Sequence, residues 1–259
     1  MPAQKRRVRA KPKSPKRAIK RAVERAAKPS KRQSGWQRDP QGMRQRILDA
    51  AMAEFARHGL GGARIDRIAK AAGANKRMIY YHVGDKEALY LAILEATYER
   101  IRVAERRLNL EALGPRDAIA RLLAFTWQYY IDNPEFLALL NEENLHRARY
   151  LKKSRKVKDM HSPFVASIAE ILQRGEKSGD VRPGIDPVQL YISIAGLCYF
   201  YQSNSATLGT IFGRDLLEQG ARDERLVHMT DLLVAAISPA TPASLDKAPG
   251  VEFNQRVKI

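Results

Sequence analysis

The chain has 259 residues, with 46 Lys and Arg against 28 Asp and Glu, so its formal net charge is +18. This length suffices for one or two domains with a core that needs no disulfides, and the composition is typical of a folded chain. The single cysteine, Cys198, excludes a disulfide framework and any metal site built from several cysteines. The basic excess points to a polyanionic partner.

Most of this charge lies at the N-terminus. Residues 1–38 hold 15 basic side chains and one acid, Glu24, so they carry +14 of the +18. Dense like charge with few apolar side chains predicts a disordered basic tail over 1–38. An Arg-rich, acid-poor leader is also typical of a mitochondrial transit peptide. Residues 238–259 begin with a stretch rich in Pro, Ala, Ser and Thr, which predicts a loose C-terminal tail.

Helical periodicity dominates the chain between the tails, and no alternating segment bounded by turn signals argues for a sheet. Asn75 and Asp85 are expected N-caps, and Gly59, Gly73 and Gly84 are expected helix breakers. We therefore predict an all-α fold. The expected helices cover about 42–58, 65–72, 76–82, 86–108, 188–207 and 222–237. Three more are marked by the apolar residues of 119–130, by those of 136–145, which start a helix, and by those of 164–172 in a helix that ends near 175–179.

Two short helices face each other across a tight turn at Gly73, which is the pattern of a helix-turn-helix. In this motif the second helix enters the major groove of DNA, and its first turn reaches the base edges. Lys76 and Arg77 occupy that turn, and arginine can bind guanine with two hydrogen bonds. The alternative is a solvated charged face. The predicted DNA contacts are Arg64, Asn75, Lys76, Arg77, Met78, Tyr80, Tyr81, His82 and Lys86.

A characteristic set of residues surrounds this motif: Ile47, Ala50-Ala51, Phe55, Gly59, Ile68-Ala69, Ala72-Gly73, Lys76, Ile79-Tyr80, His82 and Asp85-Lys86-Glu87-Ala88-Leu89. With these residues, 44–89 resemble the N-terminal domain of the TetR family of transcriptional repressors, and the likeness extends over about 43–237. Two departures bear on operator preference: Ala63 and Arg64 stand where the family usually has Thr or Ser, and Met78 replaces a small hydroxyl residue.

The resemblance implies a helix-turn-helix DNA-binding domain over 39–88 and an effector-binding and dimerisation domain over 89–237. It also implies a repressor that binds a near-palindromic double-stranded operator as a homodimer and responds to an unknown small-molecule effector. We expect a cytoplasmic, nucleoid-associated protein with no enzymatic activity, cofactor, metal or membrane partner. The longest charge-free run, 187–213, has a dense apolar part of only about a dozen residues, too short for a span.

Aromatic and polar side chains of the second half are candidates for an effector pocket, because such pockets are apolar with a few polar groups. The alternative for each of them, and the one that the sequence favours, is a plain core residue. The candidates are Trp127, Tyr130, Phe136, Asn144, His146, Cys198 and Tyr201. Seven basic residues in 147–158 suggest an exposed connector, or alternatively a rim that attracts an anionic effector.

The predicted helix over 188–207 is apolar on every side, so it must be buried or paired. Together with 222–237 it is a candidate for a four-helix interface between two copies, and burial within one subunit is the alternative. The predicted interface residues are Leu190, Ile194, Leu197, Leu226, Met229 and Leu233.

Two other functional classes compete with a regulator. An architectural DNA-binding protein would act mainly through the basic tail. A di-iron enzyme is suggested by Glu143-x-x-His146, but such a site needs a second Glu-x-x-His. None of the other histidines has a glutamate three residues before it, so we predict neither a metal nor a catalytic site.

Overall fold

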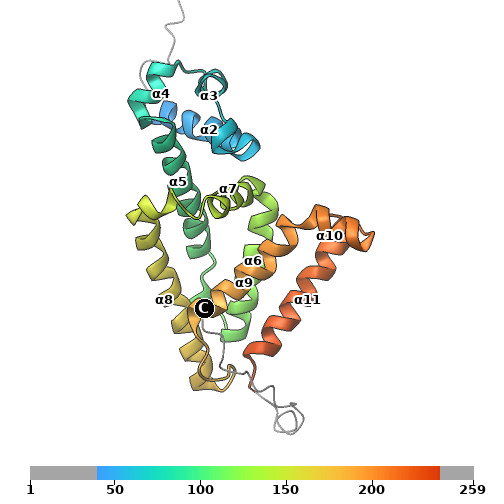
Figure 1. Ribbon diagram of the computed structural model, residues 1–259. Coiled ribbons are helices and arrows are strands. Elements are labelled where there is room, and N and C mark those ends of the chain that lie inside the picture. The colour runs from blue at the N-terminus through green and yellow to red at the C-terminus, as the bar shows by residue number, and fades with distance from the viewer. Residues whose placement is uncertain (1–39, 240–259) are drawn as a thin grey trace, which may run out of the picture. The chain divides into compact units, whose positions relative to one another are not determined.

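The computed structural model describes residues 40–239, and within them it contains helices and no strand (Figure 1). The predicted all-α fold is confirmed. The predicted basic tail and nearly all of the C-terminal tail lie outside the described residues. The α-helices are α2 (Pro40–Gly62), α3 (Ile65–Ala72), α4 (Lys76–Val83), α5 (Lys86–Arg106), α6 (Pro115–Asp132), α7 (Pro134–Leu145), α8 (Arg155–Ser178), α9 (Pro187–Ser203), α10 (Ser205–Phe212) and α11 (Gln219–Ile237), with 3-10 turns η2 (Leu110–Ala112) and η3 (Leu151–Lys153).

Local signals set the ends of the N-terminal helices. Gly59 interrupts α2 with φ 62° and ψ 176°, and Gly73 ends α3 in the left-handed conformation (φ 62°, ψ 31°). Both conformations favour glycine because it has no Cβ. The side chain of Asn75 accepts a hydrogen bond from the backbone N–H of Met78 (2.9 Å), and that of Asp85 accepts one from Ala88 (2.8 Å). These two N-caps confirm the predicted starts of α4 and α5.

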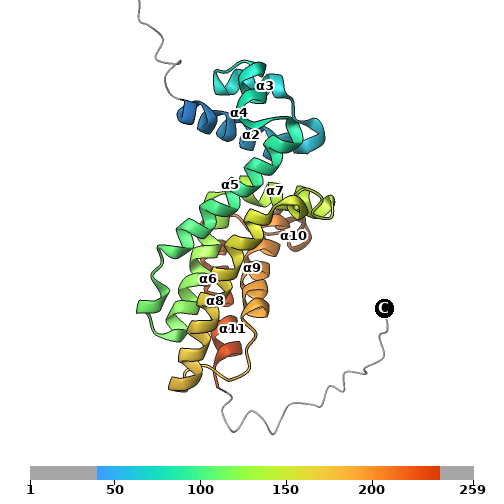
Figure 2. The ribbon, with the colours of Figure 1, turned by 90° about the vertical axis from the view of Figure 1, so that its left-hand side faces the viewer.

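The larger part of the fold is a helical bundle built around α6. This helix packs against α8, α9 and α11, and α5 packs along α8 (Figures 1 and 2). Ile119, Leu122 and Leu123 of α6 are fully buried in the centre of the core. No helix within residues 40–239 is both long and apolar enough to cross a membrane.

Two predicted boundaries in the C-terminal half are wrong. The continuous helix expected over 188–207 is divided at Asn204, whose side-chain amide donates to the carbonyl of Phe200 (2.9 Å) and to Ser203 Oγ (3.0 Å). An asparagine that bonds to nearby backbone competes with helix continuation. The basic stretch 147–158 is also only partly a connector, because α8 begins at Arg155, with Ser154 accepting a hydrogen bond from Val157 N (3.2 Å).

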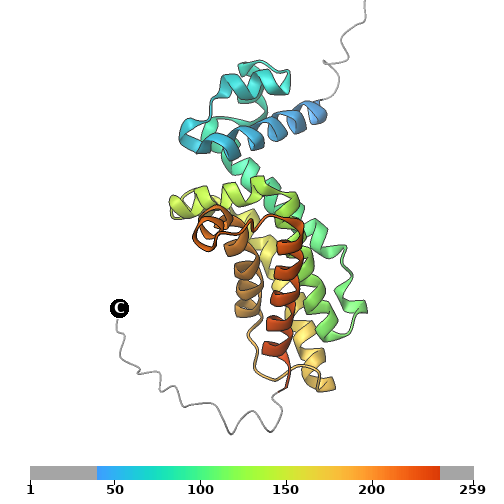
Figure 3. The ribbon, with the colours of Figure 1, turned by 90° about the vertical axis from the view of Figure 1, so that its right-hand side faces the viewer.

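The apolar residues predicted to form a dimer interface turn inward. Leu190, Ile194, Met229 and Leu233 are buried in the core of the subunit. Leu197 and Leu226 are half-buried against the same core. Different apolar residues of α9 and α11, two helices that lie at the front of Figure 3, are exposed. These are Val188, Ile192, Phe200, Val227 and Leu232, with exposed fractions of 45–61%.

Candidate nucleic-acid interface and ligand cavity

The helix-turn-helix is held together by small and apolar side chains. Ala69 and Ala72 of α3 and Ile79 of α4 are buried, and the two helices pack directly on one another. Small alanine side chains allow this close approach, and Gly73 supplies the turn between the helices. The opposite face of α4 is therefore left facing outward.

The predicted DNA contacts gather on that outward face and beside it. Six of them lie on α4, while Asn75 caps it, Arg64 precedes α3 and Lys86 begins α5. Tyr80 is 51% exposed and Tyr81 is 85% exposed, although tyrosine rings usually bury most of their area. The exposed members are Arg64, Asn75, Lys76, Arg77, Tyr80 and Tyr81, and the partly buried ones are Met78, His82 and Lys86.

Two of the basic side chains in this region form ion pairs with acidic neighbours. Lys76 Nζ lies 2.7 Å from Asp66 Oδ1, and this hydrogen-bonded ion pair raises the pKa of Lys76. Glu54 accepts hydrogen bonds from the backbone N–H of Arg64 (2.9 Å) and from Arg67 Nε (2.7 Å). Desolvation opposes the ionisation of Glu54, but these bonds outweigh it and lower the pKa of its carboxyl. Arg67 thus braces the motif, whereas Arg77 has no acidic partner among the described ion pairs.

Side chains of the bundle contact the N-terminal helices close to the break at Gly59. Glu142 Oε1 on α7 accepts a hydrogen bond from the backbone N–H of Leu60 (2.8 Å). Tyr90 of α5 packs edge-on against Phe55 and Tyr150, with ring centroids 5.2 and 5.3 Å apart. Burial raises the pKa of Tyr90. These contacts connect α2 and α5 to the bundle.

The Glu143-x-x-His146 motif has a structural role. Glu143 is buried and accepts a hydrogen bond from the backbone N–H of Leu151 (2.9 Å), whereas His146 follows the end of α7 and contacts Glu142 (3.3 Å). The two residues of the motif therefore have different partners. Within residues 40–239, no group of three or more His, Cys, Asp or Glu side chains is arranged to hold a metal ion.

Five of the predicted effector-pocket residues are packed in the core. Trp127 and Tyr201 make an edge-on ring contact (5.4 Å), and Tyr130 packs on Phe136 (5.6 Å). Burial raises the pKa of the Cys198 thiol to about 12. The other two, Asn144 and His146, are exposed, and none of the seven lines the cavity described next. Their role in effector binding stays a prediction.

A cavity of about 770 Å³ lies between the C-terminal end of α5, the 3-10 turn η2 and the side of α8 from Asp159 to Arg174. Its volume is within the range of small-molecule sites in proteins. Arg102 and Glu105 form its buried polar part. Its apolar lining comes from Leu110, Met160, Pro163, Phe164 and Ile171, and the other charged residues that line it are Arg106, Glu111, Asp159, Glu170 and Arg174.

Sequence reasoning missed Arg102 and Glu105, because charged residues were assigned to surfaces. A signal was present: Thr97, Ile101 and Glu105 follow each other at four-residue steps along the buried side of α5, and Arg102 lies next to Ile101. Two opposite charges on the core-facing stripe of a helix are unusual and indicate a paired or functional site.

Comparisons with known proteins agree on one family. Residues 47–93 match the family described as bacterial regulatory proteins, tetR family, and residues 115–233 match the tetracyclin repressor-like C-terminal domain. The transcriptional repressor NicS of Pseudomonas putida is 37% identical over 194 residues, covering 75% of this chain and 92% of that protein. The transcriptional repressor SCO4008 of Streptomyces coelicolor is 33% identical over 193 residues, which cover 72% of this chain and 92% of that protein.

Solved structures show the same fold at lower identity. The putative transcriptional regulator SCO4942 of Streptomyces coelicolor has a TM-score of 0.57 and 24% identity, covering 75% of this chain and 98% of that one. FadR of Bacillus subtilis, solved in complex with stearoyl-CoA, has a TM-score of 0.56 and 16% identity, and the match covers 74% of this chain and 98% of that one.

Proposed function

Since the chain belongs to the TetR family of bacterial transcriptional regulators, we propose that it is a ligand-responsive repressor that binds a near-palindromic operator as a homodimer. The observation that carries this proposal is the outward face of α4, where Lys76, Arg77, Tyr80 and Tyr81 are all exposed on a helix anchored by buried Ile79. Such a face suits the major groove, where arginine can identify guanine.

The chemistry divides the basic residues by role. Arg77 is suited to base recognition, because its planar fork can make two hydrogen bonds to guanine. Lys86 begins α5, where the free backbone N–H groups of a helix N-terminus also favour a phosphate. Two copies of α4 would read half-sites about one helical turn apart, or a multiple of that distance.

Arg77→Ala tests the recognition helix. An operator selected from a random-sequence pool is titrated with the protein beside unrelated DNA of the same length, at several salt concentrations. We expect Arg77→Ala to lose about tenfold or more in operator affinity and much less on unrelated DNA. Arg121→Ala removes an exposed charge from α6 and serves as the matched control. If Arg77→Ala keeps full operator preference, α4 is not the recognition helix.

The outer faces of α9 and α11 supply the surface for a second copy. Five large apolar side chains are exposed there, and an apolar patch rimmed by polar residues favours association. Ile192→Lys should convert the dimer to a monomer in light scattering, because a lysine would be buried without a partner. Leu145→Lys changes a 77% exposed apolar residue on α7 and should leave the dimer intact.

The architectural alternative is tested by removing the basic tail, residues 1–38. A regulator that reads DNA through α4 should keep its operator preference with weaker affinity and a shallower salt dependence. An architectural protein that acts through the tail would lose nearly all binding. The relatives named above are transcriptional regulators, which favours the first outcome.

A further inference from the structure

The buried part of the cavity contains a guanidinium group whose charge is incompletely matched. Arg102 is 2% exposed, and its Nη2 donates to the hydroxyl oxygen of Tyr191 (3.0 Å). Its Cζ lies 4.0 Å from the ring centroid of Phe164 and 5.4 Å from that of Tyr191. Aromatic faces stabilise a guanidinium but do not neutralise it.

The neighbouring carboxyl group does not complete the site. Nε of Arg102 lies 2.9 Å from Glu105 Oε2, an ion-pair distance, yet the angles do not make a hydrogen bond. Nε and Nη1 of Arg102 and both oxygens of Glu105 are buried without a hydrogen-bond partner. Leaving such groups unsatisfied is costly, and both residues belong to the lining of the cavity, so a ligand bound there can supply the missing partners once these side chains adjust to it.

Protonation of Glu105 would remove the negative charge that lies beside Arg102. Burial raises the pKa of Glu105 to about 8, although the positive charges of Arg102 and Arg106 act in the opposite direction. Burial therefore favours the neutral form of the carboxyl, and in that form Glu105 leaves the positive charge of Arg102 without a buried counter-charge. A protonated Glu105 can also donate a hydrogen bond.

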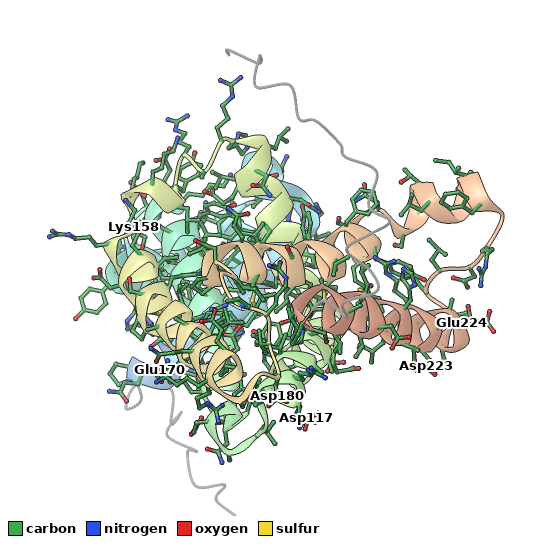
Figure 4. All side chains as sticks on the ribbon, turned by 90° about the horizontal axis from the view of Figure 1, so that it is seen from below. Asp117, Lys158, Glu170, Asp180, Asp223 and Glu224 are labelled. Atoms are coloured by element: carbon green, nitrogen blue, oxygen red, sulfur yellow. The ribbon has the colours of Figure 1, made fainter. Side chains whose placement is uncertain are left out.

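Apolar walls surround this polar part. Leu110, Phe164 and Ile171 are buried residues of the lining, and they offer flat and branched surfaces to a ring. Exposed charges of both signs lie farther out, including Arg106, Arg174 and Glu170, the last of which Figure 4 labels on α8. Solvent screens these exposed charges more than it screens Arg102.

We propose that this cavity is the effector site of the protein and that it binds an aromatic or heteroaromatic carboxylate, whose carboxylate group accepts hydrogen bonds from Arg102 Nη1. The ring packs against Phe164 and the aliphatic lining, and Glu105 donates to the second carboxylate oxygen. The role of the ligand as an effector rests on the proposed function, while the chemistry of its binding rests on the cavity alone.

Calorimetric titration of the full chain with benzoate and with benzamide at pH 7 tests the chemistry. The two probes have nearly the same shape, but only benzoate is an anion. We expect benzoate to bind once per subunit and at least about tenfold more tightly than benzamide, as a charge-assisted hydrogen bond requires. Equal binding of both probes, or no binding of benzoate, would overturn the proposal.

Variants locate the binding. Arg102→Gln should weaken benzoate binding about tenfold or more, whereas Arg107→Gln, which removes an exposed charge just after the same helix and outside this lining, should change it less than twofold. Because Arg102→Gln changes a buried residue, Ser167→Phe is a second variant. Ser167 is half-buried and lines the cavity, so a phenyl ring there should block benzoate. Unchanged binding in Ser167→Phe places the ligand elsewhere and overturns the proposal.

Operator binding measured on the same preparations separates this inference from the proposed function. A wild-type protein that selects an operator but does not bind benzoate refutes the ligand site and leaves the repressor function standing. A protein that binds benzoate through Arg102 but selects no operator refutes the repressor function and leaves the carboxylate site standing. Release of the operator by benzoate in wild type, and not in Ser167→Phe, supports both.

Discussion

Glu105 should make the stability of the fold decrease as the pH rises. Its carboxyl has an ordinary pKa of 4.5 and a folded-state pKa of about 8, because burial disfavours the charged form. Between these two values the folded state binds more protons than the unfolded state. Rising pH therefore favours unfolding over the window from about 4.5 to 8. Glu105→Gln removes the titrating group and should remove this dependence.

The full effect follows from the pKa shift. The difference between the ordinary and the folded-state pKa of Glu105 corresponds to about 5 kcal/mol of unfolding free energy, lost progressively across the window. The conversion applies because Glu105 is only 4% exposed, so solvent screens it little. The groups that face it are Arg102 and Arg106 on α5, Tyr129 on α6, Tyr191 on α9 and, around the cavity, Glu111, Asp159, Glu170 and Arg174.

Chemical denaturation at pH 5, 6.5 and 8, at one fixed protein concentration, measures this effect. Glu105→Gln should match the wild type near pH 5 and exceed it by several kcal/mol at pH 8. Glu99→Gln is the control, because Glu99 lies on the same helix but forms an exposed ion pair with Lys156 (2.8 Å). Its profile should parallel that of the wild type. If the Glu105→Gln profile is also parallel, Glu105 is ionised in the fold and the reasoning fails.

Three further changes test the DNA-binding motif and the core. Asp66→Asn releases Lys76 from its ion pair and should strengthen binding to any DNA about threefold, measured by fluorescence anisotropy. Asn75→Ala should lower the unfolding free energy by about 1 kcal/mol, and Asn75→Ser should restore it. Gly175→Ala would place a Cβ 2.8 Å from that of Val181, so thermal denaturation should reveal a loss of about 1–3 kcal/mol.

The N-terminal helices could be predicted from the sequence because their signals are local. Asn75 and Asp85 cap helices through bonds to residues three positions later, and Gly73 ends a helix by its own conformation. The exposed face of α4 follows from the same logic, since burial of Ile79 fixes how the helix is turned. The division at Asn204 was harder to predict, because asparagine is tolerated within helices and neither Gly nor Pro marks the break.

The interior of the bundle could not be predicted in full, because the periodicity of apolar residues does not show which element covers them. An apolar residue on α9 or α11 is expected to be buried, but the sequence pattern does not show whether α6 or a second subunit buries it. Ile194 is covered within the subunit, whereas Ile192, two residues earlier, is 54% exposed. Arg102 likewise enters the core because Phe164 and Tyr191, more than 60 residues away in sequence, form an aromatic pocket around it.

One helix links the two sites. α5 begins at Lys86, beside the predicted DNA-contacting face, and carries Arg102 and Glu105 near its other end. Lys86 and Arg102 are sixteen residues apart, or about 24 Å along the helix axis, and α5 is continuous between them. A ligand held by both Arg102 and Phe164 joins α5 to α8. Such a ligand can release DNA only if it binds more tightly to a conformation in which α5 holds α4 away from its DNA-binding position. A ligand with equal affinity for both conformations does not change the equilibrium between them.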